Sequence, residues 1–372
     1  RRGYLVDPMA SPEESPVVEA VESGPTLSDV IELLPERVYD NPTSLGMIYF
    51  ARDLVLYLGL VALLVVVDSP FLLVPLWILT AFTTAAIFIL GHDAAHETLF
   101  KSKRLNYLVG VVSMLPSLHI YEAWVFGHNR VHHGHTVREG MDYVWHPTTP
   151  EQYRAMTSLQ RAVHRLKWSW LGAGVYYGWD IWWKNMMHFQ GTAKIAANVK
   201  RDRRIVLIYG SLLTVVLLGA GAATYGGIGG ALWMWTKVFA VPFVLWNYVI
   251  GLAVYVHHVA PDIHWLSRRE WTRFKGQMEG TTILHVPAWM NFFMHNIMMH
   301  VAHHVDMRIP FYRLPEACEV IRKGYADVVR ERDFDLSDYV RITRTCKLYD
   351  FNTHSWSGYE AAKESPALVA QA

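Results

Sequence analysis

Four stretches of the chain are long enough and apolar enough to cross a lipid bilayer as helices. A spanning helix needs roughly 20 apolar residues to cover the hydrocarbon core. The four stretches are residues 48–67, 70–91, 205–223 and 228–256. Only Asp68 and Ser69 separate the first two, and a glycine-rich turn containing Gly226 and Gly230 separates the last two. The pattern predicts two helical hairpins, with every long polar segment on the same side of the membrane.

Shorter apolar patterns lie outside these hairpins. Thr26 and Asp29 have the spacing of a helix N-cap before residues 27–34, a short amphipathic helix that either lies on the membrane or packs against the fold. Residues 105–120 are apolar but are interrupted by Pro116, which favours a re-entrant or interfacial segment over a true span. Five tryptophans predict a helix at the headgroup level, with ordinary aromatic packing as the alternative: Trp168, Trp170, Trp179, Trp182 and Trp183.

Basic residues are concentrated on one side of the predicted hairpins. Lys and Arg are dense within residues 97–204, whereas neither short turn carries one. By the positive-inside rule the polar side, with both termini, is cytoplasmic. Residues 1–25 are rich in proline and glutamate and have no apolar signal-peptide core, so they are expected to form a mobile tail. The expected location is the plasma membrane or the endoplasmic reticulum.

Composition narrows the function. The chain is 52% hydrophobic, more than a soluble core usually needs, and 34 Lys and Arg nearly balance 33 Asp and Glu. A membrane is therefore a better partner than nucleic acid. The only cysteines, Cys318 and Cys346, form no CxxC, so a disulfide framework, a zinc ribbon and an iron–sulfur cluster all lack ligands.

Histidine is the residue that carries the chemistry. The chain has 19 histidines, and three tight groups of them fall on the predicted cytoplasmic side. Spacings of three and four residues place imidazoles on one face of a helix. The groups are His92 and His96; His128, His132 and His133, with His135 nearby; and His300, His303 and His304.

Eight clustered imidazoles are too many for one ion and indicate two metals. Zinc performs no redox chemistry, and His92 lacks the neighbouring glutamate of a zinc peptidase. Iron is favoured, because a pair of irons can share the electrons needed to cleave O2 and attack an unactivated C–H bond.

The three groups resemble the HxxxH, HxxxHH and HxxHH boxes of the membrane fatty acid desaturase superfamily. The context is similar to its acyl-lipid delta-12 or omega-6 branch, and the resemblance extends from about Pro25 to about Ala317. The segments that carry it are Gly91-His92-Asp93-Ala94-Ala95-His96, Gly127-His128-Asn129, Phe293-Met294-His295-Asn296-Ile297, Ala302-His303-His304, Arg308-Ile309-Pro310-Phe311-Tyr312 and Pro315-Glu316-Ala317.

The resemblance implies an all-α integral membrane fold, with four transmembrane helices in two hairpins and a cytoplasmic helical cap that holds a di-iron site. It also implies a ninth histidine at the end of the fourth span, and Tyr255-Val256-His257-His258 resembles the family's Tyr-Leu-Gln-His. Position 258 therefore matches the ligand, and His257 stands where glutamine is usual. The implied metal ligands are His92, His96, His128, His132, His133, His258, His300, His303 and His304.

Other polar residues near the boxes have weaker claims. Asn296 would share a face with His300 if the helix were continuous, either holding a metal-bound water or making an outer hydrogen bond. Asp93, and with less support Asp306, could orient an imidazole. His257 and His295 remain possible metal or outer contacts. His135, His264 and His285 are expected to be outer or structural groups, and His119, His146, His164, His188 and His354 to be surface residues.

The resemblance implies an O2-dependent fatty acyl desaturase that forms a cis double bond, of the delta-12 type that turns a monoene into a diene. A hydroxylase, an epoxygenase or a carotenoid oxygenase could use the same boxes, and a membrane metal carrier or sensor is a non-enzyme alternative. The chain shows no electron-carrier motif of its own, so ferredoxin or cytochrome b5 with its reductase is the expected donor. Arg201, Arg203 and Arg204 either dock it or contact lipid headgroups.

The expected division of the chain follows from these assignments. Residues 1–25 form the tail and residues 26–320 the membrane desaturase domain. The cap within it comprises residues 92–204 and 257–320, and a C-terminal cytoplasmic segment follows at 321–372.

Overall fold

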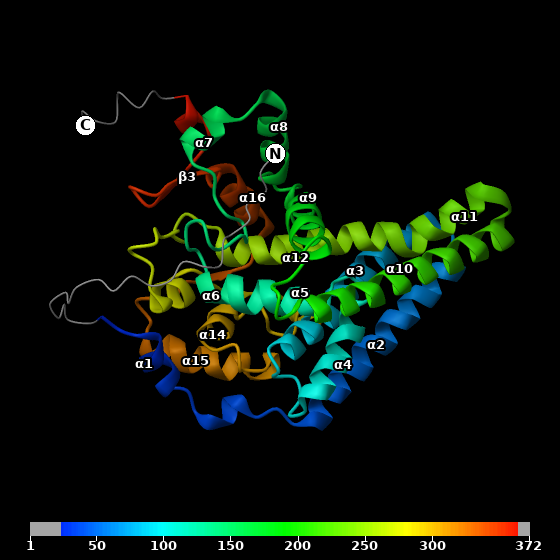
Figure 1. Cartoon of the computed structure of the whole chain (residues 1–372), viewed down its shortest axis with the longest axis horizontal. Helices are drawn as coiled ribbons and strands as arrows, with labels where there is room; N and C mark the ends of the chain where they lie inside the picture. The colour runs from blue at the N-terminus through cyan, green and yellow to red at the C-terminus, as the bar shows by residue number, and fades with distance from the viewer. Residues whose placement is uncertain (1–23, 364–372) are drawn as a thin grey trace.

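The structure is a computed structural model that describes residues 24–363; the tail expected over residues 1–25 lies almost wholly outside them. Four helices are long and apolar enough to cross a membrane. They pair as two hairpins that form an arm extending from a helical cap (Figure 1). The helices are α2 (Thr43–Val66), α3 (Pro70–Ala95), α10 (Ala196–Tyr225) and the continuous rod Gly227–His258, which comprises α11 (Gly227–Trp235), the π-helical segment η4 (Thr236–Ala240) and α12 (Val241–His258).

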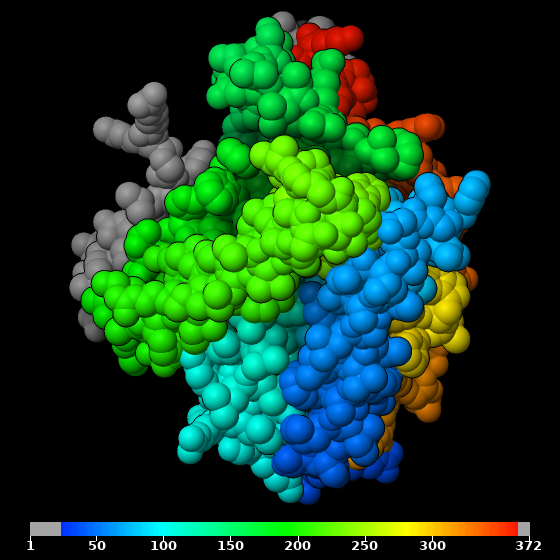
Figure 2. Space-filling model, turned by 90° about the vertical axis from the view of Figure 1, so that its right-hand side faces the viewer, coloured from blue at the N-terminus to red at the C-terminus, as the bar shows by residue number. Residues whose placement is uncertain are grey.

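The four predicted spans are confirmed, and three of them extend well beyond the apolar stretch. Helix α3 continues to Ala95 and α12 to His258, so both carry histidines out of the apolar zone. The outer surface of the arm exposes apolar side chains, as on Val55, Val215 and Ile228. Figure 2 looks onto this arm, with α2 and the α10–α11 hairpin running along its surface. An apolar surface of this extent is what a lipid environment accommodates.

A buried lysine joins the two hairpins at the end of the arm away from the cap. Lys237 is fully buried, and its Nζ donates to Asp68 Oδ1 and Tyr225 Oη, both at 2.7 Å, and to the carbonyls of Val65 and Val67 at 3.2 and 3.1 Å. The ammonium thus finds acceptors on the first hairpin's turn, as a charge within an apolar helix must.

The cap is helical except for two small sheets. Strand β1 (Ile283–His285) pairs in parallel with β2 (Glu331–Asp333), and β3 (Leu348–Asp350) pairs antiparallel with β4 (Ser355–Ser357). The remaining elements are α1 (Leu27–Glu32), η1 (Glu36–Tyr39), α4 (Lys103–Met114), α5 (Tyr121–Trp124), η2 (Val125–His132), α6 (His133–His135), α7 (Pro150–Ala155), α8 (Ser158–Lys167), α9 (Ala173–Tyr176), η3 (Tyr177–Met187), η5 (Lys275–Glu279), α13 (Ala288–Met294), α14 (His300–Val305), η6 (Phe311–Arg313), α15 (Leu314–Gly324), α16 (Leu336–Thr345) and η7 (Tyr359–Ala362).

Two of the shorter predictions can be judged from packing. Thr26 and Asp29 form the expected capping box, and Val30 is fully buried in the main core, so α1 packs against the fold. Helix α4 has 12 residues and at 1.5 Å per residue is about 18 Å long, too short for a span. The true span considered for residues 105–120 is therefore wrong.

The expected tryptophan-bearing helix is divided between burial and exposure. Trp168 is buried in the core, whereas Trp179 and Trp183 on η3 are 50% and 40% exposed. The C-terminal segment does not stand apart from the cap, because β2 pairs with β1 and the Tyr349 hydroxyl bonds the Trp265 backbone.

Candidate metal centre

Nine buried histidines converge in the cap and form two groups. Within each group, the candidate ligand atoms all lie within 4.8 Å of one another. These are the nine positions that the sequence comparison with the desaturase boxes singled out. The first group is His92, His96, His128, His133 and His303, and the second is His132, His258, His300 and His304.

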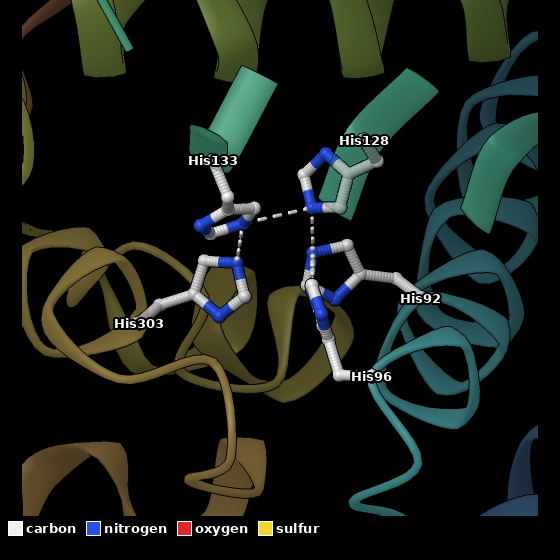
Figure 3. Close-up of side chains that lie close together, drawn as sticks. All are labelled: His92, His96, His128, His133 and His303. Carbon is white, nitrogen blue, oxygen red and sulfur yellow. Dashed lines mark hydrogen bonds between the residues drawn. The ribbon is translucent and has the colours of Figure 1, made fainter. Parts of the chain in front are cut away.

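The first group surrounds a small space between helix ends (Figure 3). The Nε2 atom of His128 lies 2.8 Å from Nε2 of His92 and 3.1 Å from Nε2 of His133. The His133 atom lies 3.0 Å from Nε2 of His303, and Nε2 of His96 lies 3.3 Å from Nε2 of His92. Three segments of the chain, one for each histidine box, thus supply nitrogen atoms to one point.

The two groups are separated by helix geometry. In the π-helical segment η2 the backbone N–H of His133 bonds the carbonyl of His128, five residues back. Residues five apart therefore share a face, so His133 joins His128 while His132 turns to the second group. Helix α14 also serves both groups, with His303 in the first and His300 and His304 in the second.

Hydrogen bonds fix the orientation of five of the nine rings. Each Nδ1 faces an acceptor at 2.8 to 3.1 Å, so Nδ1 carries the proton and Nε2 keeps its lone pair. The pairs are His92 with Asp93, His132 with Asp142, His258 with the Gly280 carbonyl, His300 with the Ile297 carbonyl and His304 with Gln277.

Facing lone pairs require a cation between them. The Nε2 atoms of His300 and His304 are 3.2 Å apart, yet both rings already donate from Nδ1, so neither nitrogen can donate to the other. Burial also lowers the pKa of His128, His133 and His303, with the neighbouring imidazoles adding to the effect, which favours the neutral form that binds metal. Imidazole nitrogen suits iron, copper, zinc and nickel, and the donor set fits two such ions.

Two of the weaker candidates do not face the histidines. The helix is not continuous through residue 296, so the condition for Asn296 to share a face with His300 is not met: α13 ends at Met294, and His295 and Asn296 have φ of 48° and 57°. Asn296 consequently bonds Asn291 at 2.6 Å, and His295 bonds Asp53 at 2.6 Å. Neither contacts the metal ligand candidates through these bonds.

Of the two aspartates expected to orient an imidazole, only Asp93 does so. Asp93 orients His92, as expected, and its other oxygen accepts from the Phe311 N–H at 2.7 Å. Asp306 instead binds Arg308 and Tyr39, so its proposed contact with an imidazole is wrong.

Of the remaining histidines, His257 is the one that faces the site. Its ring stacks on His300 with centroids 3.8 Å apart, and neither of its nitrogens has a hydrogen-bond partner among residues 24–363. His119 and His164 are 1% and 7% exposed, so their placement on the surface is wrong: each packs among aromatic rings brought together from distant segments. His188 is exposed, as expected, while His146 and His354 are half-buried.

Outer contacts were the part of the site that sequence reasoning missed. Asp142 accepts from His132 with both oxygens at 3.1 Å, and Gln277 accepts from His304 at 2.8 Å while donating to the His133 carbonyl at 2.7 Å. Neither residue stands at a spacing that links it to a histidine box, so no local signal marks them.

A cavity of about 60 Å³ opens beside the two histidine groups. It touches both, at His92 and His300, and its other walls are largely apolar. Its apolar walls are suited to contact with the methylenes of a hydrocarbon chain next to the metal positions. The apolar part includes Phe88, Ile89, Ile181, Ile250, Ala253 and Val254.

Comparison with known proteins gives a consistent result. The fatty acid desaturase family model matches residues 46–334. The chain is 27% identical to an sn-1 oleoyl-lipid 12-desaturase of Synechocystis sp., over 87% of this chain and 89% of that protein. It is 27% identical to a chloroplastic omega-6 fatty acid desaturase of Arabidopsis thaliana (87% and 70% covered) and 29% identical to an sn-1 acyl-lipid omega-3 desaturase (ferredoxin) of Nostoc sp. (80% and 80%).

Proposed function

The chain belongs to the fatty acid desaturase family, and from this premise we propose that it introduces a cis double bond at the delta-12, or omega-6, position of a membrane-lipid acyl chain. It is a membrane oxidoreductase that desaturates fatty acyl chains of lipids. The position is supported by the names of the relatives from Synechocystis and Arabidopsis. The substrate would be a monoene and the product a diene.

The observation that carries this proposal is the convergence of nine buried imidazoles in two groups beside an apolar cavity. We propose that these nine histidines hold two iron ions. Bound there, the irons would supply the redox chemistry that activates O2 and breaks an unactivated C–H bond.

The protein's own residues position the reactants. The apolar wall formed by Ile250, Ala253 and Val254 would bind adjacent methylenes next to the histidines and exclude water. Asp93 and Asp142 keep protons on Nδ1 of His92 and His132, so each Nε2 points inward. Over one cycle, two acyl hydrogens, O2, two electrons and two protons give one double bond and two water molecules.

A hydroxylase or epoxygenase outcome is the alternative within this chemistry, because the same ligands serve it. A carotenoid oxygenase and a membrane metal carrier or sensor are not favoured by the family match and the named relatives.

We propose a topology in which the cap and both termini lie on the cytoplasmic side, in either the plasma membrane or the endoplasmic reticulum. The desaturase domain would cover residues 26–320 and the C-terminal segment residues 321–372. Electrons would come from ferredoxin or from cytochrome b5 with its reductase, and the name of the Nostoc relative supports ferredoxin.

The direct test is gas chromatography with mass spectrometry of the fatty acids of a host that makes oleoyl lipids and expresses this chain. The wild type should yield a new diene whose second double bond is at carbon 12. His303→Ala removes a nitrogen from the first group and should abolish the diene. His188→Ala, which alters an exposed histidine, should leave it unchanged.

Three results would contradict the proposal. A hydroxy or epoxy acid in place of the diene would assign the alternative chemistry. A diene with another bond position would refute the delta-12 assignment. Unchanged acyl chains from protein that contains two irons and receives electrons from a supplied donor would refute fatty acyl desaturation in that host.

A further inference from the structure

A tryptophan in contact with one arginine, in a segment rich in exposed cations, lies on the surface of the cap near the second histidine group. Trp271 is half-buried, and the Arg138 guanidinium carbon lies 5.1 Å from its ring centroid. Arg268 contributes to lowering the pKa of Arg138, after burial, which shows that the two charges are close. Further exposed cations in the same segment are Arg269, Arg273 and Lys275.

These charges are not neutralised within the described part of the chain. No ion pair among residues 24–363 involves Arg268, Arg269, Arg273 or Lys275. The acid in their midst, Glu270, bonds elsewhere, to His354 and Ser267. Clustered unpaired cations raise the local positive potential and attract an acidic partner.

Trp271 connects this surface to the histidines through one residue. Its Nε1 donates to the Thr136 carbonyl at 2.8 Å, and Thr136 Oγ1 lies 3.3 Å from Nδ1 of His304. Gly276 makes this placement possible, because a Cβ there would meet Trp271 Nε1 at 2.7 Å and the Thr136 carbonyl at 3.1 Å. The indole of Trp271 is therefore connected to His304 of the second group through hydrogen-bond contacts of Thr136.

The surface faces away from the membrane arm. Residues 259–282 (yellow) lie at the end of the molecule opposite the α10–α11 turn (Figure 1). A lipid headgroup is thus the wrong partner for these cations. By contrast, Arg201 and Arg203 lie where α10 leaves the cap and are already engaged, the first with Asp202 at 2.8 Å and the second with the Phe189 carbonyl.

We propose that the cations around Trp271 dock an acidic one-electron carrier protein of the ferredoxin type, and that Trp271 and Thr136 lead its electron to the second histidine group. The inference rests on the proposed function. Each docking oxidises one carrier by one electron, and two dockings supply the two electrons that O2 reduction requires per double bond. The site takes the place of the patch expected at Arg201, Arg203 and Arg204.

The test uses the iron-loaded full chain in nanodiscs of neutral lipid, with a plant-type [2Fe–2S] ferredoxin as the probe. Ferredoxin binding is measured by biolayer interferometry at low and high salt, and iron reduction by stopped-flow absorbance. Arg268→Gln with Arg273→Gln should slow association on the order of 10-fold at low salt and flatten the salt dependence. Arg268→Lys with Arg273→Lys should restore both, and Arg201→Gln with Arg204→Gln is the matched control.

The route is tested separately with Trp271→Leu. This variant should bind ferredoxin with unchanged Kd but should reduce its iron more slowly, at unchanged iron content. Reduction at the wild-type rate would overturn the route through Trp271.

Other results would overturn the docking surface. Loss of binding in the Arg201 and Arg204 variant, with retention in the Arg268 and Arg273 variant, would place the carrier at the other patch. Weaker flotation of the Arg268 and Arg273 variant than of the wild type with anionic vesicles, together with no ferredoxin binding by the wild type, would assign these cations to lipid. A host that makes diene while the purified wild type binds no ferredoxin would overturn this inference and leave the proposed desaturation standing.

Discussion

Asp142 holds His132 in place, and replacing it should weaken metal binding in the second histidine group without unfolding the cap. Its carboxylate accepts from His132 Nδ1 with both oxygens at 3.1 Å and from the backbone N–H groups of Val137 at 3.1 Å and Val144 at 3.0 Å. Asp142→Asn keeps an oxygen for a backbone N–H but loses the charge that orients the imidazole and raises its basicity.

The expected magnitude follows from this contact set. Loss of such an outer carboxylate typically costs 10- to 100-fold in metal affinity, or about 1.4–2.8 kcal/mol. Asp142→Ala should cost more, because it also leaves two buried N–H groups without acceptors, at about 1–3 kcal/mol each in the free energy of unfolding. The asparagine variant leaves only one of these N–H groups without an acceptor, so comparing it with the alanine variant separates the effect on affinity from the effect on stability.

The assay is retained iron per chain, measured by mass spectrometry after equilibration with a series of competing chelators. Asp142→Asn should lose one iron at lower chelator strength than the wild type and retain the other. Asp306→Asn is the matched control, since Asp306 is a buried carboxylate that binds Arg308 and Tyr39. Identical chelator curves for wild type and Asp142→Asn, or equal loss in Asp306→Asn, would refute the assigned role.

Two further predictions concern stability. Burial, with Lys347 and Lys167 nearby, lowers the pKa of His164 from 6.5 to about 4. Just below pH 6.5 only the unfolded chain takes up the proton, so the contribution of His164 to the free energy of unfolding should fall by roughly 2 kcal/mol between pH 6.5 and 5. Chemical unfolding at these two pH values should show a smaller fall in stability for His164→Gln than for the wild type. An equal fall in the two proteins would refute the lowered pKa of His164. Lys237→Met removes the hydrogen bonds to Asp68, Tyr225 and two carbonyls and should lower the thermal midpoint of unfolding by the equivalent of about 2 kcal/mol. Asp68→Asn is the milder comparison, because Lys237 then keeps its other acceptors. An unchanged midpoint in Lys237→Met would show that the lysine does not hold the hairpins together.

The elements that could be predicted are those specified by local sequence. Apolar length alone located all four spans, because the bilayer sets the number of residues needed. The histidine boxes identified eight of the nine positions that the structure brings together, since their spacing is local and their density is far above chance, and the family resemblance supplied the ninth, His258. Thr26 and Asp29 located α1 for the same reason.

What could not be predicted depends on distant contacts or on small backbone changes. Asp142 reaches His132 through a loop, and no periodic pattern encodes that approach. The π-helical turn that separates His132 from His133 differs from an α-helix by one residue per turn, which composition does not show. The end of the helix before Asn296 could not be predicted because two successive non-glycine residues adopt positive φ there, and His119 was misplaced because only the folded chain surrounds it with aromatic rings.

The six-residue helix α14 makes the two metal positions mechanically dependent. His303 belongs to one group and His300 and His304 to the other, so a rotation of α14 about its axis would move ligands of both positions at once. A substitution that reorients this helix would therefore change the affinity for both ions, not for one alone. Changes to packing beneath α14 should thus shift both affinities, whereas changes in α12, which supplies only His258 of the second group, can act on one position alone.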